Sequence, residues 1–239
     1  SATVLQCEFI TNLAMYGGGI AYLGDGSIVV HFVGSSTFSN NTANGGNGGA
    51  IYGLANALSF YENRFIGNSA VNGGGLSFTD VARLYGTGNL VCDNRASWDG
   101  GGLYMENSGG SRTLYGTVFQ ENSATRGGAV FESGVSVNSY TYYFYLDVLN
   151  NTSTDSYLDG MVTDTTLGTI AQQYPRYAIF YYNDEVGLAQ TSSTELGYQT
   201  YTETLFYGHT KSSIYRAPDL IGSYSNVEAD PKYASYKDD

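Results

Sequence analysis

The residues that could carry out chemistry include two acids at equivalent places in a repeated motif. Asp93 and Glu121 each stand directly before an asparagine. If successive repeats stack, these carboxylates lie roughly 5 Å apart, which is the separation that retaining glycosidases use. Two solvated carboxylates on the outside of a turn give the same pattern. We therefore keep Asp93, Glu121 and the nearby Arg126 as candidates, and we predict that the chain is not an enzyme.

A second set of residues could bind rather than cleave. Tyr52, Tyr104 and Phe131 each follow a Gly-Gly-aliphatic motif, so we expect them to point outward as a partial column. Trp98 and Arg126 both fall four residues after the repeated asparagine, which predicts a cation–π pair. An outward aromatic row can stack on sugar rings or on another protein. The alternative is cross-strand packing that stiffens a sheet.

The other reactive residue types point to no site. His31 and His209 have no Ser or Cys partner at the spacing of a nucleophilic triad. Cys7 and Cys92 stand three repeats apart, so we predict no disulfide between them. No Cys/His spacing resembles a zinc site, and the glycine clusters do not match a phosphate-binding loop. We expect no metal and no cofactor.

Composition limits the partners of the chain. Its 239 residues include 10 Lys+Arg and 22 Asp+Glu, for a net charge of −12. This balance argues against nucleic acid, which proteins bind mainly through Lys and Arg. No run of 18 apolar residues is present, so we expect no membrane-spanning helix. Low lysine with abundant Gly, Asn and Tyr fits an extracellular or cell-surface protein.

These residues are positioned by a repeat that fills the first two thirds of the chain. An apolar residue, two variable residues and an asparagine precede a glycine pair and an aliphatic residue, as in Phe38-Ser-Asn-Asn41 to Gly48-Gly49-Ala50-Ile51. The last copy is degenerate: it begins at Val148 and lacks the glycine pair. The repeated asparagines are Asn12, Asn41, Asn68, Asn94, Asn122 and Asn151.

The repeat predicts an all-β fold, a parallel β-helix with about 28 residues and three short strands per coil. Glycines in the middle of each copy argue against helices, and the runs between them are rich in β-forming residues. The asparagines should form one inward ladder of stacked amides, and the aliphatic residues a second column. That column comprises Ile20, Ile51, Leu76, Leu103 and Val130.

The paired motifs Phe-x-x-Asn and Gly-Gly-Ala-Ile resemble the repeats of polymorphic outer-membrane proteins. These are autotransporter-passenger-like right-handed β-helices, related to surface proteins of the pectin-lyase-like superfamily. The segment from Tyr224 to Tyr233 is similar to one that closes many such proteins. Polysaccharide lyases of this fold use Arg or Lys as the base beside acidic calcium ligands. The resemblance therefore also marks Arg95 and Arg126, near Asp93, Asp99 and Glu121, as a lyase-like cluster.

We expect residues 1–239 to form a single β-helix domain, with regular repeats over 1–134 and irregular Tyr-rich coils and long loops over 135–239. A separate second domain is the alternative. The sequons place Asn40 and Asn150 as accessible glycosylation sites, since Asn41 and Asn151 belong to the inward ladder.

The sequence favours an extracellular structural or adhesive β-helix. Both ends look open, which predicts head-to-tail stacking on other copies into a filament or surface fibre, or on further coils of a longer chain. The alternatives are a polysaccharide lyase or hydrolase of the pectin-lyase-like fold, and a glycan-binding module.

Overall fold

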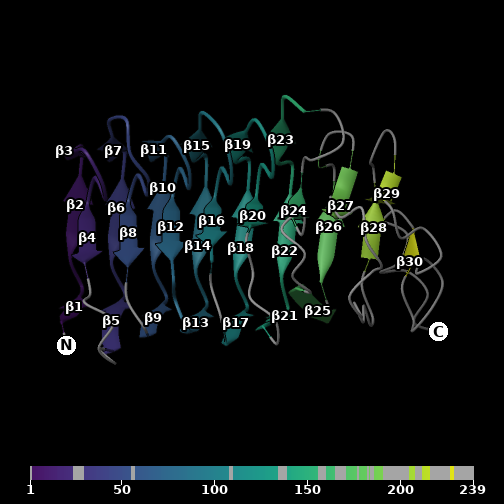
Figure 1. Cartoon of the computed structure of the whole chain (residues 1–239), viewed down its shortest axis with the longest axis horizontal. Helices are drawn as coiled ribbons and strands as arrows, with labels where there is room; N and C mark the ends of the chain where they lie inside the picture. The colour runs from purple at the N-terminus through teal and green to yellow at the C-terminus, as the bar shows by residue number, and fades with distance from the viewer. Residues whose placement is uncertain are drawn as a thin grey trace, which may run out of the picture.

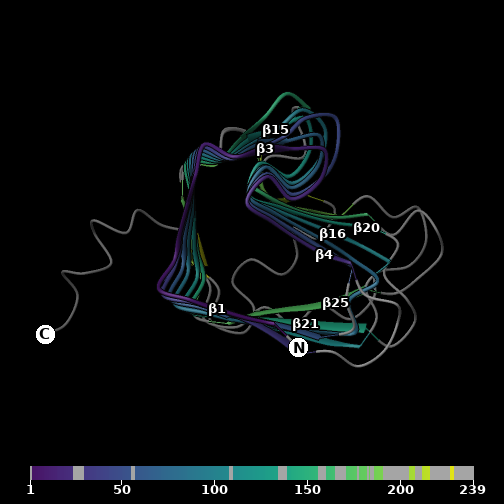
Figure 2. The same cartoon turned by 90° about the vertical axis from the view of Figure 1, so that its left-hand side faces the viewer.

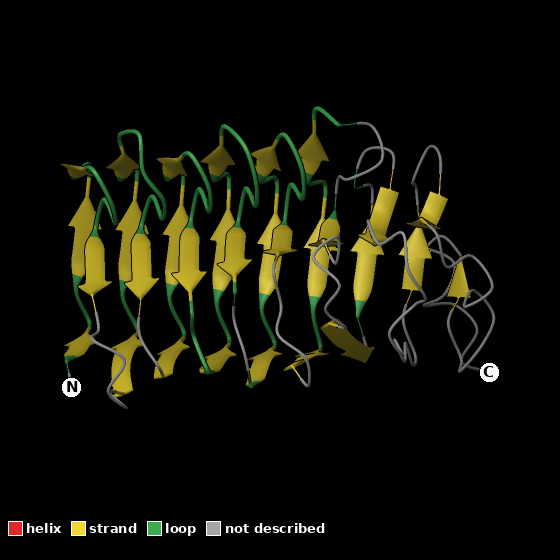
Figure 3. Ribbon diagram, viewed as in Figure 1, coloured by secondary structure: helices red, strands yellow, loops and turns green. Residues whose placement is uncertain are grey.

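The computed structural model describes the chain to Asp164 with short gaps and the remainder in short segments. The described residues are 2–23, 30–54, 57–107, 110–133, 139–155, 160–164, 171–176, 178–181, 183, 186–190, 205–207, 212–215 and 227–228. Within them every regular element is a β-strand (Figure 3).

The strands form four parallel sheets, which the chain visits in the repeating order A, B, C, D from β1 to β24 (Figure 1). Sheet A contains β1 (Thr3–Leu5), β5 (Val30–Gly34), β9 (Ala57–Tyr61), β13 (Arg83–Thr87), β17 (Ser111–Tyr115), β21 (Ser139–Phe144) and β25 (Ala171–Arg176). Sheet B contains β2 (Glu8–Ile10), β6 (Thr37–Ser39), β10 (Arg64–Ile66), β14 (Leu90–Cys92), β18 (Val118–Gln120), β22 (Asp147–Leu149), β26 (Ile179–Tyr181), β28 (Leu205–Tyr207) and β30 (Val227–Glu228).

The other two sheets complete each coil. Sheet C contains β3 (Leu13–Ala14), β7 (Thr42–Ala43), β11 (Ser69–Ala70), β15 (Arg95–Ala96), β19 (Ser123–Ala124) and β23 (Thr152–Ser153). Sheet D contains β4 (Ile20–Leu23), β8 (Ile51–Leu54), β12 (Leu76–Thr79), β16 (Leu103–Glu106), β20 (Val130–Ser133), β24 (Met161–Asp164), β27 (Val186–Gln190) and β29 (Ser212–Tyr215).

One coil is therefore four consecutive strands, beginning with β1–β4, and the coils stack as a parallel β-solenoid. Figure 2 looks along the stack and shows that equivalent strands overlie one another. This confirms the predicted fold class and the coil length of roughly 28 residues. The expectation of three strands per coil was wrong. Sheet C supplies a fourth strand of two residues, which is too short to produce an alternating pattern in the sequence.

The interior consists of columns of like residues, one from each coil. Phe65 pairs in register with Phe38 and with Val91. The Phe38 and Phe65 rings stack at 5.1 Å between centroids. The predicted aliphatic column is confirmed, because Ile20, Ile51, Leu76, Leu103, Val130 and then Met161 follow one another in register.

The asparagine ladder is also confirmed, and it occupies the corner between sheets B and C. Asn68 shows the pattern of every inner rung. Its backbone N–H and its Nδ2 both donate to Oδ1 of Asn94, at 2.9 Å each. Its Nδ2 also donates to the carbonyl of Phe38 in the preceding coil. The inner asparagines are fully buried, whereas Asn12 in the first coil is exposed.

The ladder continues one rung further than the sequence analysis recognised. Asn183 accepts from both the backbone and the side chain of Asn151, at 3.0 and 2.9 Å. The signal was present, since Phe180-Tyr-Tyr-Asn183 repeats the Phe-x-x-Asn pattern. A shorter second ladder lies at the corner between sheets A and B. There Asn63 donates to Asn89 Oδ1 from its backbone and its side chain.

The glycine pair is required by close backbone contact. A Cβ on Gly101 would lie 2.3 Å from the carbonyl oxygen of Gly128 and within 2.7 Å of the Ser123 backbone. Without side chains, the glycine pair lets the chain entering sheet D pass directly against the backbone of sheet C. A left-handed glycine lies three residues before the aliphatic column residue, as Gly48 (φ 71°) does before Ile51 and Gly100 (φ 65°) before Leu103.

One polar cluster interrupts the apolar interior. Arg112 and Glu132 are fully buried, with Nη2 and Oε2 3.7 Å apart. Arg112 Nε donates to Thr141 Oγ1 at 2.8 Å, and the Tyr143 hydroxyl donates to Glu132. Each buried charge is thus matched by its neighbour, as buried ions must be.

Replacing Asn94 by alanine should lower the free energy of unfolding by about 1–3 kcal/mol, because the buried backbone groups of Asn68 and Phe65 lose their partners. Chemical denaturation followed by circular dichroism measures the loss. The exposed Asn44 lies outside the ladder, so Asn44→Ala should change stability by less than about 0.5 kcal/mol. Equal losses in the two variants would contradict the ladder's role.

Glu132→Met should destabilise the chain by about 3–5 kcal/mol, because it leaves the Arg112 guanidinium buried without its carboxylate. The double variant Arg112→Leu/Glu132→Met gives this coil the residues of the preceding one, since Leu84 and Met105 hold the equivalent places. We expect the double variant to recover most of the lost stability in the same denaturation assay. A double variant less stable than Glu132→Met alone would refute this account.

Candidate functional site: the outer faces of the coils

The candidate acids lie where the repeat places them, at the corner just before the ladder. Asp93 and Glu121 occupy equivalent positions in adjacent coils, both exposed, with left-handed φ of 57° and 54°. That conformation turns each side chain away from the interior and into solvent. The two carboxylates are therefore aligned because the same backbone turn recurs in each coil.

The Cys92 thiol lies close enough to both carboxylates for their charges to affect its pKa. It donates to Asp93 Oδ2 at 3.2 Å. Burial, the hydrogen bond to Asp93 and the charges of Asp93 and Glu121 raise the pKa of Cys92 to about 11. Cys7 and Cys92 are both free thiols, as predicted.

Arg126 lies elsewhere, in the loop that connects sheets C and D. It forms a bidentate ion pair with Asp99, at 2.8 Å from Nε and 2.7 Å from Nη2. Its guanidinium also stacks on Phe131, 4.6 Å from the ring centroid. The structure thus joins Arg126 to Asp99 and Phe131, while Asp93 and Glu121 lie at the corner before the ladder. Trp98, its expected partner, is 63% exposed.

The predicted aromatic row on sheet D does not form an accessible surface. Tyr104 and Phe131 are buried, at 6% and 1% exposure, and Tyr52 is half-buried. The C–D loops fold back over this face (Figure 2). Burial, followed by the nearby Glu106 carboxylate, raises the pKa of Tyr104 above its usual range. The expectation of outward exposure was wrong because the loops supply a second layer.

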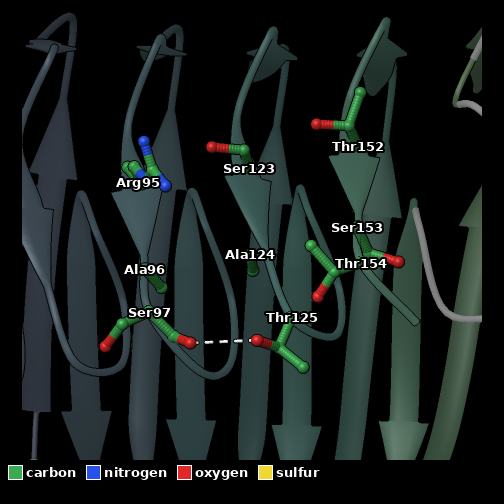
Figure 4. A pocket seen from close by; sticks show the side chains of 9 residues that line it. All are labelled: Arg95, Ala96, Ser97, Ser123, Ala124, Thr125, Thr152, Ser153 and Thr154. Carbon is green, nitrogen blue, oxygen red and sulfur yellow. Dashed lines mark hydrogen bonds between the residues drawn. The ribbon is translucent and has the colours of Figure 1, made fainter.

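A shallow groove of about 270 Å³ follows the outside of sheet C (Figure 4). It is lined by serine, threonine and alanine from three successive coils, together with Arg95. Thr125 Oγ1 donates to the carbonyl of Ser97 in the preceding coil, at 2.9 Å. Arg95 is the one ionisable residue in the lining. The groove thus offers hydroxyl groups but no carboxylate to pair with that arginine.

Sheet A carries an exposed aromatic surface that the sequence analysis missed. We call it the tyrosine face; its residues are Tyr61, Tyr85, Tyr115, Tyr142, Phe144 and Tyr145. Tyr85 is 51%, Tyr115 45% and Tyr145 50% exposed. The sequence does contain a pattern that predicts this aromatic surface. Tyr61, Tyr115 and Phe144 each stand four residues before the apolar residue that opens a Phe-x-x-Asn-type motif.

A depression of about 340 Å³ adjoins Tyr85 on the same sheet. Its lining includes the outward residues Ser59, Arg83, Ser111 and Thr113. Polar donors and acceptors therefore lie beside the aromatic rings.

The sequon residues are arranged as expected. Asn40 and Asn150 are exposed at the left-handed corner, with φ of 56° and 53°, while Asn41 and Asn151 are buried in the ladder. Glycosylation of Asn40 and Asn150 stays a prediction.

Two further features are absent from the described part of the chain. Among these residues, no three His, Cys, Asp or Glu side chains gather as a metal site would require. The same residues contain no helix with the length and apolar character needed to cross a membrane.

Residues 35–54, from β6 to β8, match the repeat of the Chlamydia polymorphic membrane protein family. This match and the parallel solenoid support the resemblance stated above, while the pectin-lyase-like relationship stays a prediction. A trypsin-treated variant of QnrB1, a plasmid-mediated fluoroquinolone resistance protein, matches with 13% identity and a TM-score of 0.25, over 98% of this chain and 94% of that one. No curated protein matches the chain.

Iodoacetamide at pH 8 should label Cys7 and leave Cys92 almost unmodified, because a thiol of pKa about 11 is on the order of 0.1% thiolate at that pH. Labelling of Cys92 should rise as the pH approaches 11. Asp93→Asn removes a carboxylate that raises this pKa, so it should shift the labelling to lower pH. Peptide mapping after timed alkylation gives both rates, and equal rates at pH 8 would contradict the shift.

Proposed function

We propose that the chain is a non-catalytic structural β-solenoid of the cell surface, which extends by stacking coil on coil. The observation that carries this proposal is the unbroken asparagine ladder from Asn12 to Asn183, in which every inner coil is bonded to both neighbours. The match of residues 35–54 to a Chlamydia membrane protein repeat supports a surface location.

The first coil supports the stacking part of the proposal. Strands β1 to β4 lie at the ends of their sheets, so each has a described partner on one side. A bare sheet edge templates pairing with another strand. Several large apolar side chains of this coil are exposed, among them Ile10 at 50% and Leu13 at 71%.

The asparagine ladder could also continue beyond the first coil, at Asn12. In each inner rung, the asparagine Oδ1 accepts two bonds from the coil before it. By the same pattern, Asn12 Oδ1 is the acceptor for an added coil. We propose that either further coils of a longer chain or a second copy of this chain provides this coil. A contact between copies is head-to-tail, so it propagates as a fibre unless it closes into a ring.

The candidate acids support a non-catalytic role. Asp93 and Glu121 are exposed at a solvated corner, whereas Arg126 is held by Asp99 and Phe131. An arginine bound bidentately to a carboxylate is a poor base, because the ion pair stabilises its protonated form.

The double variant Ile10→Lys/Leu13→Lys should reduce end-to-end assembly, because it places charges on the edge coil. Light scattering over a concentration series should show the unmodified chain growing with concentration and the variant remaining a monomer. Tyr85→Lys, at an exposed site on the side of the solenoid, is the matched control and should assemble normally. A monodisperse unmodified chain at high concentration, whose native mass equals that of these 239 residues, would refute the proposal.

A further inference from the structure

We propose that the tyrosine face of sheet A binds a neutral glycan chain. This goes beyond the structural role proposed above and does not depend on it, because the face lies on the side of the solenoid and not at its ends. It also differs from the aromatic row expected from the sequence, which is covered by the C–D loops.

The first support is the arrangement of the rings. Outward residues of sheet A form columns in register, so Tyr85 follows Ser59 and precedes Thr113, while Tyr61, Thr87, Tyr115 and Phe144 form the next column. Successive coils are about 4.8 Å apart, a step close to the length of one pyranose residue. Tyr61 and Tyr115 are two coils apart, which suits stacking under alternate sugars of an extended chain.

The second support is that the Tyr61 and Tyr115 rings are held in place before any ligand binds. The Tyr61 ring lies over Gly34 of the preceding coil, where a Cβ would approach it to 2.2 Å. Tyr115 packs edge-on against Tyr145, with centroids 5.1 Å apart, and it also contacts Phe144. Rings fixed by packing lose little conformational freedom on binding, which favours affinity.

The third support is the chemistry beside the rings. Sugars present apolar C–H faces with hydroxyl groups at the rim, so they need aromatic surface together with hydrogen-bonding groups. The depression next to Tyr85 supplies the hydroxyls of Ser59, Ser111 and Thr113 and the guanidinium of Arg83. In contrast, the described outward positions of β9, β13 and β17 carry no aliphatic side chain larger than alanine.

Charge then selects the class of glycan. Arg83 and Glu62 are both exposed on or beside this face, and their charges balance. The whole chain carries −12, which repels polyanions. A neutral chain is the occupant that this balance fits, and an acidic polysaccharide or an acidic protein surface is disfavoured.

The test uses the full chain and a panel of neutral hexasaccharides built from β-linked glucose, mannose, xylose and N-acetylglucosamine, with polygalacturonate as the anionic contrast. Affinities are measured by titration calorimetry and by retardation in polysaccharide-containing gels. We expect at least one neutral member to bind, and Tyr85→Ala/Tyr115→Ala to weaken that binding at least tenfold. Both tyrosines are about half exposed, so the thermal unfolding of this variant should match that of the parent.

Trp98→Ala is the matched control, since Trp98 is exposed but lies outside the tyrosine face; it should leave the affinity unchanged. Tyr115→Phe should keep most of the affinity, because it keeps the ring. Binding of polygalacturonate alone, no binding of any neutral hexasaccharide, or equal losses in the Tyr and Trp98 variants would each overturn the proposal. Cleavage of a bound hexasaccharide would refute the non-catalytic role and leave the binding site standing, so the two proposals fail separately.

Discussion

The structure depends on one repeated interaction, in which a buried asparagine amide bonds to the rung on either side. Each Oδ1 accepts from both the backbone and the side chain of the neighbouring coil, so a coil cannot shift by one residue without losing several buried hydrogen bonds. The interval between rungs still varies from 26 residues to 32. Differences in coil length must therefore be taken up away from this corner.

The corner explains why chemistry-bearing residues line up on the outside. The residue before each ladder asparagine is left-handed in every coil from Thr11 to Asn150. Short polar side chains and glycine tolerate that conformation best, and Asn40, Gly67 and Asp93 fit this rule. The alignment of Asp93 with Glu121 is thus a consequence of the turn, as is the exposure of the sequon residues.

The outer faces of sheets A and D differ because the C–D loops cover that of sheet D. On sheet D, the C–D loops fold back and convert Tyr104 and Phe131 into a second small core, with Arg126 and Asp99 at its edge. On sheet A, Tyr85 and Tyr115 stay about half exposed beside hydroxyl groups. The same kind of residue is therefore structural on one sheet and available for binding on the other.

The sequence by itself determined the period, the ladder and the aliphatic column, because stacking places residues of equal phase on top of one another. It could also have revealed Asn183, whose Phe-x-x-Asn motif lacks only the glycine pair. The tertiary structure alone decided which outward residues are exposed, because burial on a sheet's outer face depends on where a loop folds. It alone decided the Arg112–Glu132 pairing as well, since those side chains meet across the interior from two different sheets. The position of a residue within the repeat determines which residues stack above and below it along the solenoid axis, but it carries no information about contacts across the interior.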